Sequence, residues 1–524
     1  MMEFRRSSGK ITSGFAVASL ILTAIGFLDA LYLSYQHYAN TIPPCHVGFI
    51  NDCGQVLQSV YATLFGIPIA LLGTIHYALI FVSLFIAFYS GKIVWIRTSF
   101  ILTAIGFVAS LYLISIQGLV LYAWCLYCLF SAVTSFVLYF LVRYTFWHEY
   151  RIFFLKKVEL LYQSVIRQLF FAFDPEWVHE NAMFFGYWFG KVVPFRIVFD
   201  LYFRYRHSAL EQKVANIDFA NPIGLAAGYD YTAAFPQILP AIGFGFETVG
   251  TITNHPCEGN EKPRLGRLKK SRSLLVNKGF RNPGARAIIR RLTGQNFSFP
   301  LGISIGVTNT SAIKTQKQAI DDIISAFKMF GKSKVKNAYY ELNISCPNLQ
   351  TSVSFYPPKN LNSLLNAVKK IKIKKPVFIK MPIEKSDTEV KHMLDVIVKY
   401  PIAGVIFGNL QKNREDKALD PLEVVMWSKG NFSGKPTQKR SDELIKLAYK
   451  YVGKKLVIIG CGGVFNTKDT YRKIKNGATL VQMITGMIFE GPQIIARINR
   501  DLVHLLQNDG YANVSEAIGV DAKN

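Results

Sequence analysis

The chain has 524 residues, of which 50% are hydrophobic and 14% aromatic, and its formal net charge is +26. This length predicts two or three domains, and the positive mean hydropathy of +0.22 argues against a wholly soluble enzyme. Residues 1–148 hold only six lysines and arginines and three acidic residues, so most of the positive excess follows residue 148. Such an excess fits a nucleic acid, an anionic substrate or an anionic membrane surface. We expect the membrane surface, and no nucleic acid, because no segment resembles a nucleic-acid-binding module.

Four apolar stretches are each long enough to cross a bilayer, namely residues 11–38, 66–90, 95–118 and 122–143. A cleaved signal peptide is the alternative for the first stretch, but three further spans follow it. Positive residues flank the N-terminus, the 92–97 turn and the end of the fourth stretch, whereas the 39–65 loop has none. The positive-inside rule therefore predicts a multi-pass protein of the cytoplasmic (inner) membrane. The 39–65 loop would be extracytoplasmic, and both ends of the chain, with the domain that follows the spans, would be cytoplasmic.

The seven cysteines form two groups: Cys45, Cys53, Cys125 and Cys128 in the apolar part, and Cys257, Cys346 and Cys461 beyond it. Cys125 and Cys128 form a Cys-x-x-Cys pair where the fourth span begins. A helix start favours the thiolate form, and the outer membrane face permits oxidation. We therefore predict disulfide chemistry in the first group alone. A structural pair, or cysteines that serve as small apolar residues, is the alternative.

This quartet, with the run Ser-Val-Tyr-Ala-Thr-Leu-Phe-Gly-Ile-Pro at residues 59–68, resembles bacterial homologues of vitamin K epoxide reductase over about residues 10–145. The resemblance implies that Cys125 and Cys128 are the active pair beside a quinone. It also implies that Cys45 and Cys53 take electrons from an external thiol protein, by exchange between accessible thiols. No thioredoxin-like domain is visible in the sequence, so the donor would be a separate extracytoplasmic thioredoxin-like protein.

Residues 149–205 mix aromatic residues and leucine with lysine and arginine, which predicts amphipathic helices that lie on the lipid bilayer. Asp174 and Pro175 predict a helix start, as the N-cap and the first helical residue. The segment Asp-Pro-Glu-Trp-Val-His at 174–179 resembles the N-terminal extension of class 2 (quinone-dependent) dihydroorotate dehydrogenases. In that family these helices form a quinone tunnel, so the resemblance makes His179 a candidate quinone contact. A packing role for a lone helical histidine is the alternative.

From residue 206 onward, short strand-like runs alternate with helical stretches, which predicts a (β/α)8 TIM barrel. The eight expected strands are residues 223–228, 246–251, 301–306, 339–345, 376–381, 403–409, 456–463 and 479–485. The predicted fold class is thus multidomain: an all-α four-helix transmembrane bundle (1–148), amphipathic membrane-associated helices (149–205) and the barrel (206–524).

One of these runs continues into residues 339–348, where two asparagines, Asn343 and Asn348, bracket Cys346. Amides orient a polar ring and a thiol can move a proton, and the C-terminal strand ends of such a barrel carry the chemistry. The segment resembles the catalytic strand of dihydroorotate dehydrogenases, the flavin enzymes of pyrimidine biosynthesis, and the resemblance covers about residues 150–524. It implies that hydride passes from C6 of dihydroorotate to N5 of FMN while Cys346 removes the C5 proton. A thiol, with an ordinary pKa near ~8.5, suits a general base better than the serine usual in class 2; a buried, inert cysteine is the alternative.

The resemblance also assigns binding residues. For FMN it implies Ala226, Ala227, Gly228, Tyr229, Asp230, Thr251, Asn277, Ser304, Asn343, Lys380, Gly408, Gly434, Gly462, Gly463, Ile484, Thr485 and Gly486. For the substrate it implies Tyr231, Asn277, Phe280, Asn343, Asn348 and Asn409, and for the quinone Arg267 and His179. The glycines on the late strands suit a phosphate, and Lys380 would stabilise negative charge on the reduced flavin. A surface charge at Lys380, or turn-forming asparagines, are the alternatives.

Three positions depart from the family pattern, one of them Leu349, which follows Asn348 where a threonine is common. Tyr231 stands where the family has a lysine that contacts the substrate, and Ser304 replaces an asparagine that contacts the flavin. The predicted function is a membrane-bound enzyme that oxidises dihydroorotate with a quinone of the membrane pool (ubiquinone or menaquinone), fused to a quinone-dependent thiol oxidase. Tyr231 motivates the alternative of a different small substrate, and a module that serves only as a membrane anchor is a second alternative.

Overall fold

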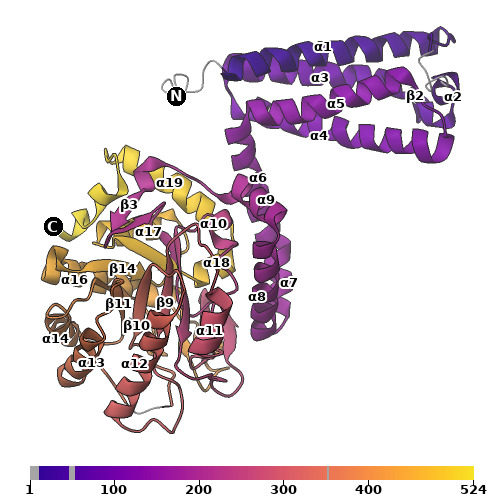
Figure 1. Cartoon of the computed structure of the whole chain (residues 1–524). Coiled ribbons are helices and arrows are strands. Elements are labelled where there is room, and N and C mark those ends of the chain that lie inside the picture. Colours follow the sequence, from indigo (N-terminus) through magenta and orange to yellow (C-terminus); the bar gives the residue numbers. More distant parts are fainter. Residues whose placement is uncertain (1–10, 46–52, 351–352, 524) are drawn as a thin grey trace. The chain divides into compact units, whose positions relative to one another are not determined.

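The computed structural model describes residues 11–45, 53–350 and 353–523, and the chain folds into two compact units, Met1–Lys157 and Val158–Asn524 (Figure 1). The positive residues among the first ten, on which the topology prediction partly rests, lie outside the described residues.

The first unit is built on four helices that are long and apolar enough to cross a membrane: α1 (Ile11–Tyr38), α3 (Ile69–Ser90), α4 (Ile93–Ile116) and α5 (Leu126–Thr145). Small residues allow these helices to pack closely, as is usual between membrane helices. A Cβ atom on Gly106 of α4, for example, would lie 2.8 Å from Nε2 of His76 on α3. The predicted four-helix fold is confirmed, although α5 begins at Leu126, so Cys125 occupies its N-cap position.

Shorter elements connect and follow these helices. They are α2 (Cys53–Leu57), the hairpin of β1 (Thr63–Leu64) and β2 (Ile67–Pro68), a π-helical turn at Gln117–Leu121, and α6 (Trp147–Leu161). In the second unit a π-helical turn at Tyr162–Ile166 precedes α7 (Arg167–Ala172), α8 (Pro175–Lys191) and α9 (Val193–Phe203). Asp174 caps α8 as predicted, because its carboxylate accepts a 2.8 Å hydrogen bond from the N–H of Trp177. Helices α8 and α9 meet at a bend of 100°, since Pro194 cannot continue the first helix.

Eight parallel strands close into a barrel in the second unit, which confirms the predicted TIM-barrel fold. The strands are β5 (Ile223–Leu225), β6 (Phe246–Ile252), β9 (Leu301–Ile305), β10 (Tyr339–Asn343), β11 (Val377–Met381), β12 (Gly404–Phe407), β14 (Val457–Cys461) and β15 (Leu480–Met483). Each lies within or overlaps one of the predicted runs. Nearly every strand residue is buried, as expected for a parallel sheet covered by helices.

Helices cover the barrel on its outer side (Figure 1). They include α11 (Ala285–Leu292), α12 (Gln316–Lys332), α13 (Pro358–Lys370), α14 (Asp387–Ile397), α16 (Gln438–Val452), α17 (Thr467–Lys475) and α19 (Ile494–Asn508). Local sequence sets several of their starts. Thr315 with Gln318, and Ser386 with Glu389, form capping boxes at α12 and α14, in which side chain and backbone satisfy each other's hydrogen bonds.

The structure contains two small sheets that the alternation of strand-like and helical stretches did not predict. One is the hairpin of β3 (Gln212–Val214) and β4 (Ile217–Phe219), and the other is the antiparallel sheet of β7 (Leu265–Leu268), β8 (Ser273–Val276) and β13 (Asn431–Phe432). Strands of two to four residues give too short a pattern to be recognised, and β13 pairs with β8 across more than 150 residues of sequence.

Candidate active site

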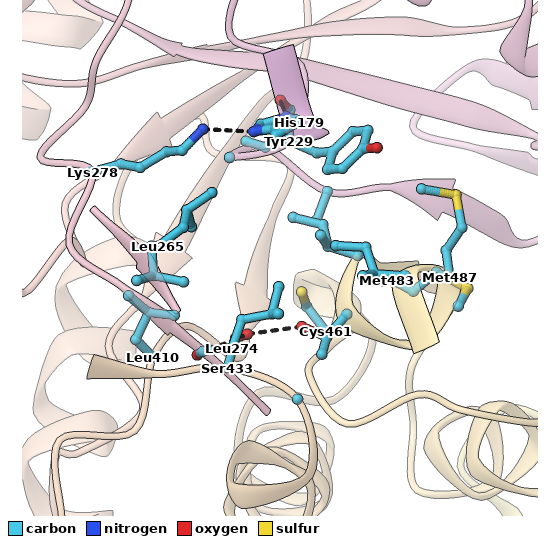
Figure 2. Close-up of a pocket in the computed structure, with 18 of the residues that line it drawn as sticks. His179, Tyr229, Leu265, Leu274, Lys278, Leu410, Ser433, Cys461, Met483 and Met487 are labelled. Carbon is cyan, nitrogen blue, oxygen red and sulfur yellow. Dashed lines mark hydrogen bonds between the residues drawn. The ribbon is translucent and has the colours of Figure 1, made fainter. Parts of the chain in front are cut away.

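A cavity of about 410 Å³ lies at the C-terminal ends of the barrel strands and extends to helices α7 and α8. This volume lies within the usual range of ~300–1,000 Å³ for small-molecule sites. Residues that end the strands form one part of its wall, and the apolar side chains Phe170, Phe171 and Val178 form another. Figure 2 shows His179 and Lys278 on one side of this cavity and Ser433 and Cys461 on the other.

Most of the residues predicted from the sequence line this one cavity. They are Ala226, Ala227, Gly228, Tyr229, Tyr231, Thr251, Arg267, His179, Phe280, Asn343, Cys346, Asn348, Lys380, Gly408, Asn409, Gly434, Gly462, Gly463, Ile484, Thr485 and Gly486. Asp230, Asn277 and Ser304 are buried and do not line it. The Asp230 carboxylate accepts hydrogen bonds from backbone N–H groups, including those of Ala234 and Phe235.

The asparagines are held by one another and by nearby hydroxyls. Asn343 donates to Oγ1 of Thr251 (2.8 Å), and Asn409 donates to the Ser345 hydroxyl (2.6 Å). Because each amide is already oriented, a polar ring that enters the cavity meets donors and acceptors in fixed positions. The amides also do not titrate, so their arrangement does not depend on pH.

Three further amides support this group, and the sequence reasoning missed them. Asn260 donates to Oδ1 of Asn277 (3.0 Å) and to the carbonyl oxygen of Asn348 (2.8 Å). Asn309 donates to Asn260, and Asn431 donates to Oδ1 of Asn348 (2.5 Å). Asn260 and Asn309 lie on loops and Asn431 begins the two-residue strand β13, and no local pattern distinguishes them from ordinary turn asparagines.

Cys346 lines the cavity just beyond β10. Burial raises the pKa of its thiol to about 12, although a hydrogen bond from the backbone of Asn348 and the charge of Lys412 oppose the rise. The ordinary thiol pKa that favoured Cys346 in the sequence reasoning therefore does not describe this site. In the free protein the thiol is protonated at neutral pH, so it can act as a base only through the small fraction of thiolate.

Lys380, at the end of β11, is buried and also lines the cavity. Burial lowers the pKa of its ammonium group, but the interactions with Cys461 and Glu341 outweigh burial, so that the pKa is raised. The carboxyl of Glu341 accepts a 2.7 Å hydrogen bond from Ser304. A cation therefore faces the cavity from the floor of the barrel at every physiological pH.

Glycines let the backbone approach the cavity closely at the ends of β12 and β14. Gly408 has φ +116°, and a Cβ there would collide with the carbonyl oxygen of Cys461. Gly462 and Gly463 also have positive φ. Within the described residues, no hydrogen-bond acceptor faces the N–H of either glycine, which leaves two donors for an anionic group such as a phosphate.

The side of the cavity next to α8 carries positive groups. Arg267 donates to the carbonyl oxygen of Phe173 (2.7 Å), and its guanidinium lies 4.8 Å from the ring centre of Phe171. His179 and Lys278 are hydrogen-bonded to each other (Figure 2). Lys278 was not among the predicted residues. Its place directly after Asn277 was the one signal in the sequence that pointed to it.

A second candidate site lies in the first unit, where all four of its cysteines pack in one cluster with Val56 and Ala123. Cys45 and Cys53 form a disulfide, and Cys125 and Cys128 are free thiols. The N–H of Cys125 donates to the side chain of Gln117 (3.0 Å). The free pair and the disulfide are thus close enough in the fold for exchange to be considered.

Comparisons with known proteins identify the family of each unit. The dihydroorotate dehydrogenase family model matches residues 209–506, and the vitamin K epoxide reductase family model matches residues 17–143. Relatives named dihydroorotate dehydrogenase (quinone) from Trichodesmium erythraeum and Christiangramia forsetii are 33% and 34% identical, over 69% and 66% of this chain and 99% of their own lengths. A crystal structure of DHODH from Eimeria tenella in complex with ferulenol matches with a TM-score of 0.58 and 27% identity, over 67% of this chain and 96% of that one. Both families are oxidoreductases, and the chain therefore belongs to the dihydroorotate dehydrogenase family, with a vitamin K epoxide reductase family domain joined ahead of its barrel.

Proposed function

We propose that the barrel oxidises dihydroorotate to orotate and passes the electrons to a membrane quinone. One observation carries this proposal: a single cavity joins the amides and Cys346 at the strand ends to the apolar wall of α7 and α8 beside Arg267. A polar substrate and an apolar acceptor would thus reach the same cavity from its two sides. The names of the relatives support the same pair of reactants.

The cavity also fits FMN as the group between these reactants. The free N–H groups of Gly462 and Gly463, with Gly434, Thr485 and Gly486, would hold the phosphate. Residues 226–229 and Thr251 would contact the ring system, and Lys380 would balance negative charge on it. FMN would supply the acceptor for the hydride that leaves C6 of the substrate.

The protein's own residues would orient the substrate and move its proton. Asn343, Asn348 and Asn409 would hold the ring, and Cys346 would take the proton from C5. Because burial disfavours the thiolate, the rate of this step should depend on pH throughout the neutral range.

The quinone would enter from the membrane along α7 and α8. These helices and α9 expose large apolar side chains, among them Phe173, Trp177, Phe184, Phe185 and Trp188. Such a surface is typical of helices that lie in the membrane interface. We infer that residues 149–205 form a membrane-association and quinone-access segment between a 1–148 transmembrane domain and a 206–524 flavin domain, and that the flavin domain is cytoplasmic.

For the first unit we infer a quinone-dependent thiol oxidase. Cys125 and Cys128 would reduce a quinone of the same pool, and Cys45 and Cys53 would receive electrons from a separate extracytoplasmic thioredoxin-like protein. The packing of the disulfide and the free pair in one cluster supports this order. It requires the 39–65 loop to face the outer side of the cytoplasmic membrane.

The decisive experiment uses the full chain purified in detergent. We expect a yellow protein whose flavin absorbance bleaches on anaerobic addition of dihydroorotate and returns on addition of a quinone. Tyr231 favours a second candidate, a different small substrate for the same flavin. If saturating dihydroorotate leaves the flavin oxidised while the protein retains FMN, the dihydroorotate proposal is wrong and the second candidate takes its place. A colourless protein that cannot be loaded with FMN would refute both.

A further inference from the structure

Lys278 is a buried basic residue at the edge of the cavity. Its side chain is 7% exposed and lines the cavity. Nζ lies 2.6 Å from Nδ1 of His179 (Figure 2). It also lies 4.4 Å from the ring centre of Tyr231. Among the described residues, no carboxylate oxygen lies within ion-pair distance of this ammonium group. A buried charge without a counter-ion is unfavourable.

His179 positions Lys278 without neutralising it. Nε2 of His179 lies 2.9 Å from the carbonyl oxygen of Tyr229. A carbonyl oxygen only accepts hydrogen bonds, so Nε2 must carry the ring proton and Nδ1 must accept from the lysine. Burial, and then the charge of Lys278, lower the pKa of His179 well below its ordinary value. The imidazole is therefore neutral and fixes the direction of the ammonium group.

The neighbouring charges leave an excess of one positive charge. The acidic residues that face this region, Glu176 and Glu180 on α8, are both paired with Arg281, at 2.9 Å and 2.5 Å. Glu176 also accepts from Arg264 at 3.2 Å. With Lys278 protonated, three cations face two carboxylates, and the uncompensated one is the lysine that borders the cavity.

We propose that Lys278 binds the carboxylate of the substrate, as the cation that Tyr231 does not supply. This inference rests on the proposed function. Lys278 follows Asn277 directly, and it reaches the cavity beside Tyr231, at whose position the resemblance places a substrate-contacting lysine. The cation would thus have moved from the loop after β5 to the loop after β8. An anionic ligand at this point would supply the missing negative charge.

The test compares ligands with and without a carboxylate. Orotate and uracil differ only in this group, so isothermal titration of the full-chain holoprotein with both isolates its contribution. Lys278→Met should raise the Kd of orotate about 10- to 100-fold, the range expected for a lost charge-assisted hydrogen bond, and leave the Kd of uracil unchanged. Lys278→Arg should recover part of the orotate affinity. Lys375→Met is the matched control, because Lys375 lies before β11 at the opposite end of the barrel and bonds to Asn337.

Three results would overturn the inference. If dihydroorotate bleaches the wild type but Lys278→Met binds orotate with an unchanged Kd, the role of Lys278 is refuted and the proposed function is left intact. A rise in the KM for quinone without a change for orotate would assign the lysine to the quinone. A wild type that neither binds orotate nor is bleached by dihydroorotate refutes the proposed function as well.

A second measurement needs no variant and therefore does not depend on the folding of Lys278→Met. Burial lowers the pKa of Lys278 to about 7, so the wild-type Kd of orotate should rise between pH 7 and pH 9 as the ammonium loses its proton. The same range should leave the Kd of uracil nearly constant. A flat orotate profile would contradict the proposal.

Discussion

The thiol of Cys346 should make flavin reduction depend on pH over the whole neutral range. Its pKa of about 12 implies a thiolate fraction of about 10⁻⁵ at pH 7, whereas an ordinary thiol has a few per cent. Each added pH unit multiplies the thiolate tenfold until the pKa is reached. If Cys346 is the base, the logarithm of the rate constant should therefore rise with a slope near one from pH 6 to pH 10, without a plateau.

Anaerobic stopped-flow measurement of flavin bleaching at saturating dihydroorotate tests this expectation. Cys346→Ala should retain FMN, lose about 10²–10⁴-fold in rate, the usual contribution of a general base, and lose the slope. Cys257→Ala is the control, because Cys257 is a buried free thiol of the barrel that bonds to the carbonyl oxygen of Gly279 and does not line the cavity. It should keep the slope. A slope that survives in Cys346→Ala would show that another group removes the proton, and a wild-type plateau near pH 8.5 would show that burial does not raise the pKa of the Cys346 thiol.

Three further outcomes are expected. The pKa of Lys278 is about 7 in the folded protein against the ordinary 10.5, so folding disfavours its protonated form. Burial of Lys278 should therefore lower the free energy of unfolding by up to about 5 kcal/mol at pH 6, and by progressively less as the pH rises toward 10.5. Lys278→Met should therefore raise the Tm of the ligand-free protein at pH 6 and raise it less at pH 9, and a lower Tm at both values would contradict the unpaired charge. Gly408→Ala should sharply reduce the FMN-to-protein absorbance ratio, because its Cβ would displace the backbone at Cys461. Gly331→Ala is the control and should not, because the space around Gly331 is open. Full FMN content in Gly408→Ala would show that FMN binding does not need the close approach of the backbone at Gly408. Cys125→Ala should abolish quinone reduction by dithiothreitol and spare that by dihydroorotate, and unchanged dithiol activity would leave the first unit an anchor.

Short-range patterns in the sequence were sufficient to predict the architecture. Runs of hydrophobic residues about twenty long gave the four helices, and the alternation of strand-like and helical stretches gave the barrel. Asp174 and Pro175 fixed the start of α8 through capping that involves only neighbouring residues. The antiparallel sheet of β7, β8 and β13 escaped prediction, because its strands are short and its pairing joins segments far apart in the chain.

The cavity residues also divide into those that local sequence patterns predicted and those that they did not. Strand-end positions such as Asn343, Lys380 and Gly408 could be named in advance, because all parallel strands of a barrel end on one face. The supporting amides Asn260 and Asn431 could not, since their importance comes from contacts with Asn277 and Asn348 that no local pattern encodes.

The sequence by itself therefore determined the four long apolar helices, the barrel, and the chemical types of the side chains at its strand ends. Only the tertiary structure decided how those side chains behave. It joined His179 to Lys278 across 99 residues of sequence, paired Glu176 and Glu180 with arginines so that the lysine remained uncompensated, and buried Cys346 so that its pKa rose to about 12. The physical reason is that desolvation and charge pairing depend on every group within a few ångströms, and in a barrel most of those groups come from distant parts of the chain.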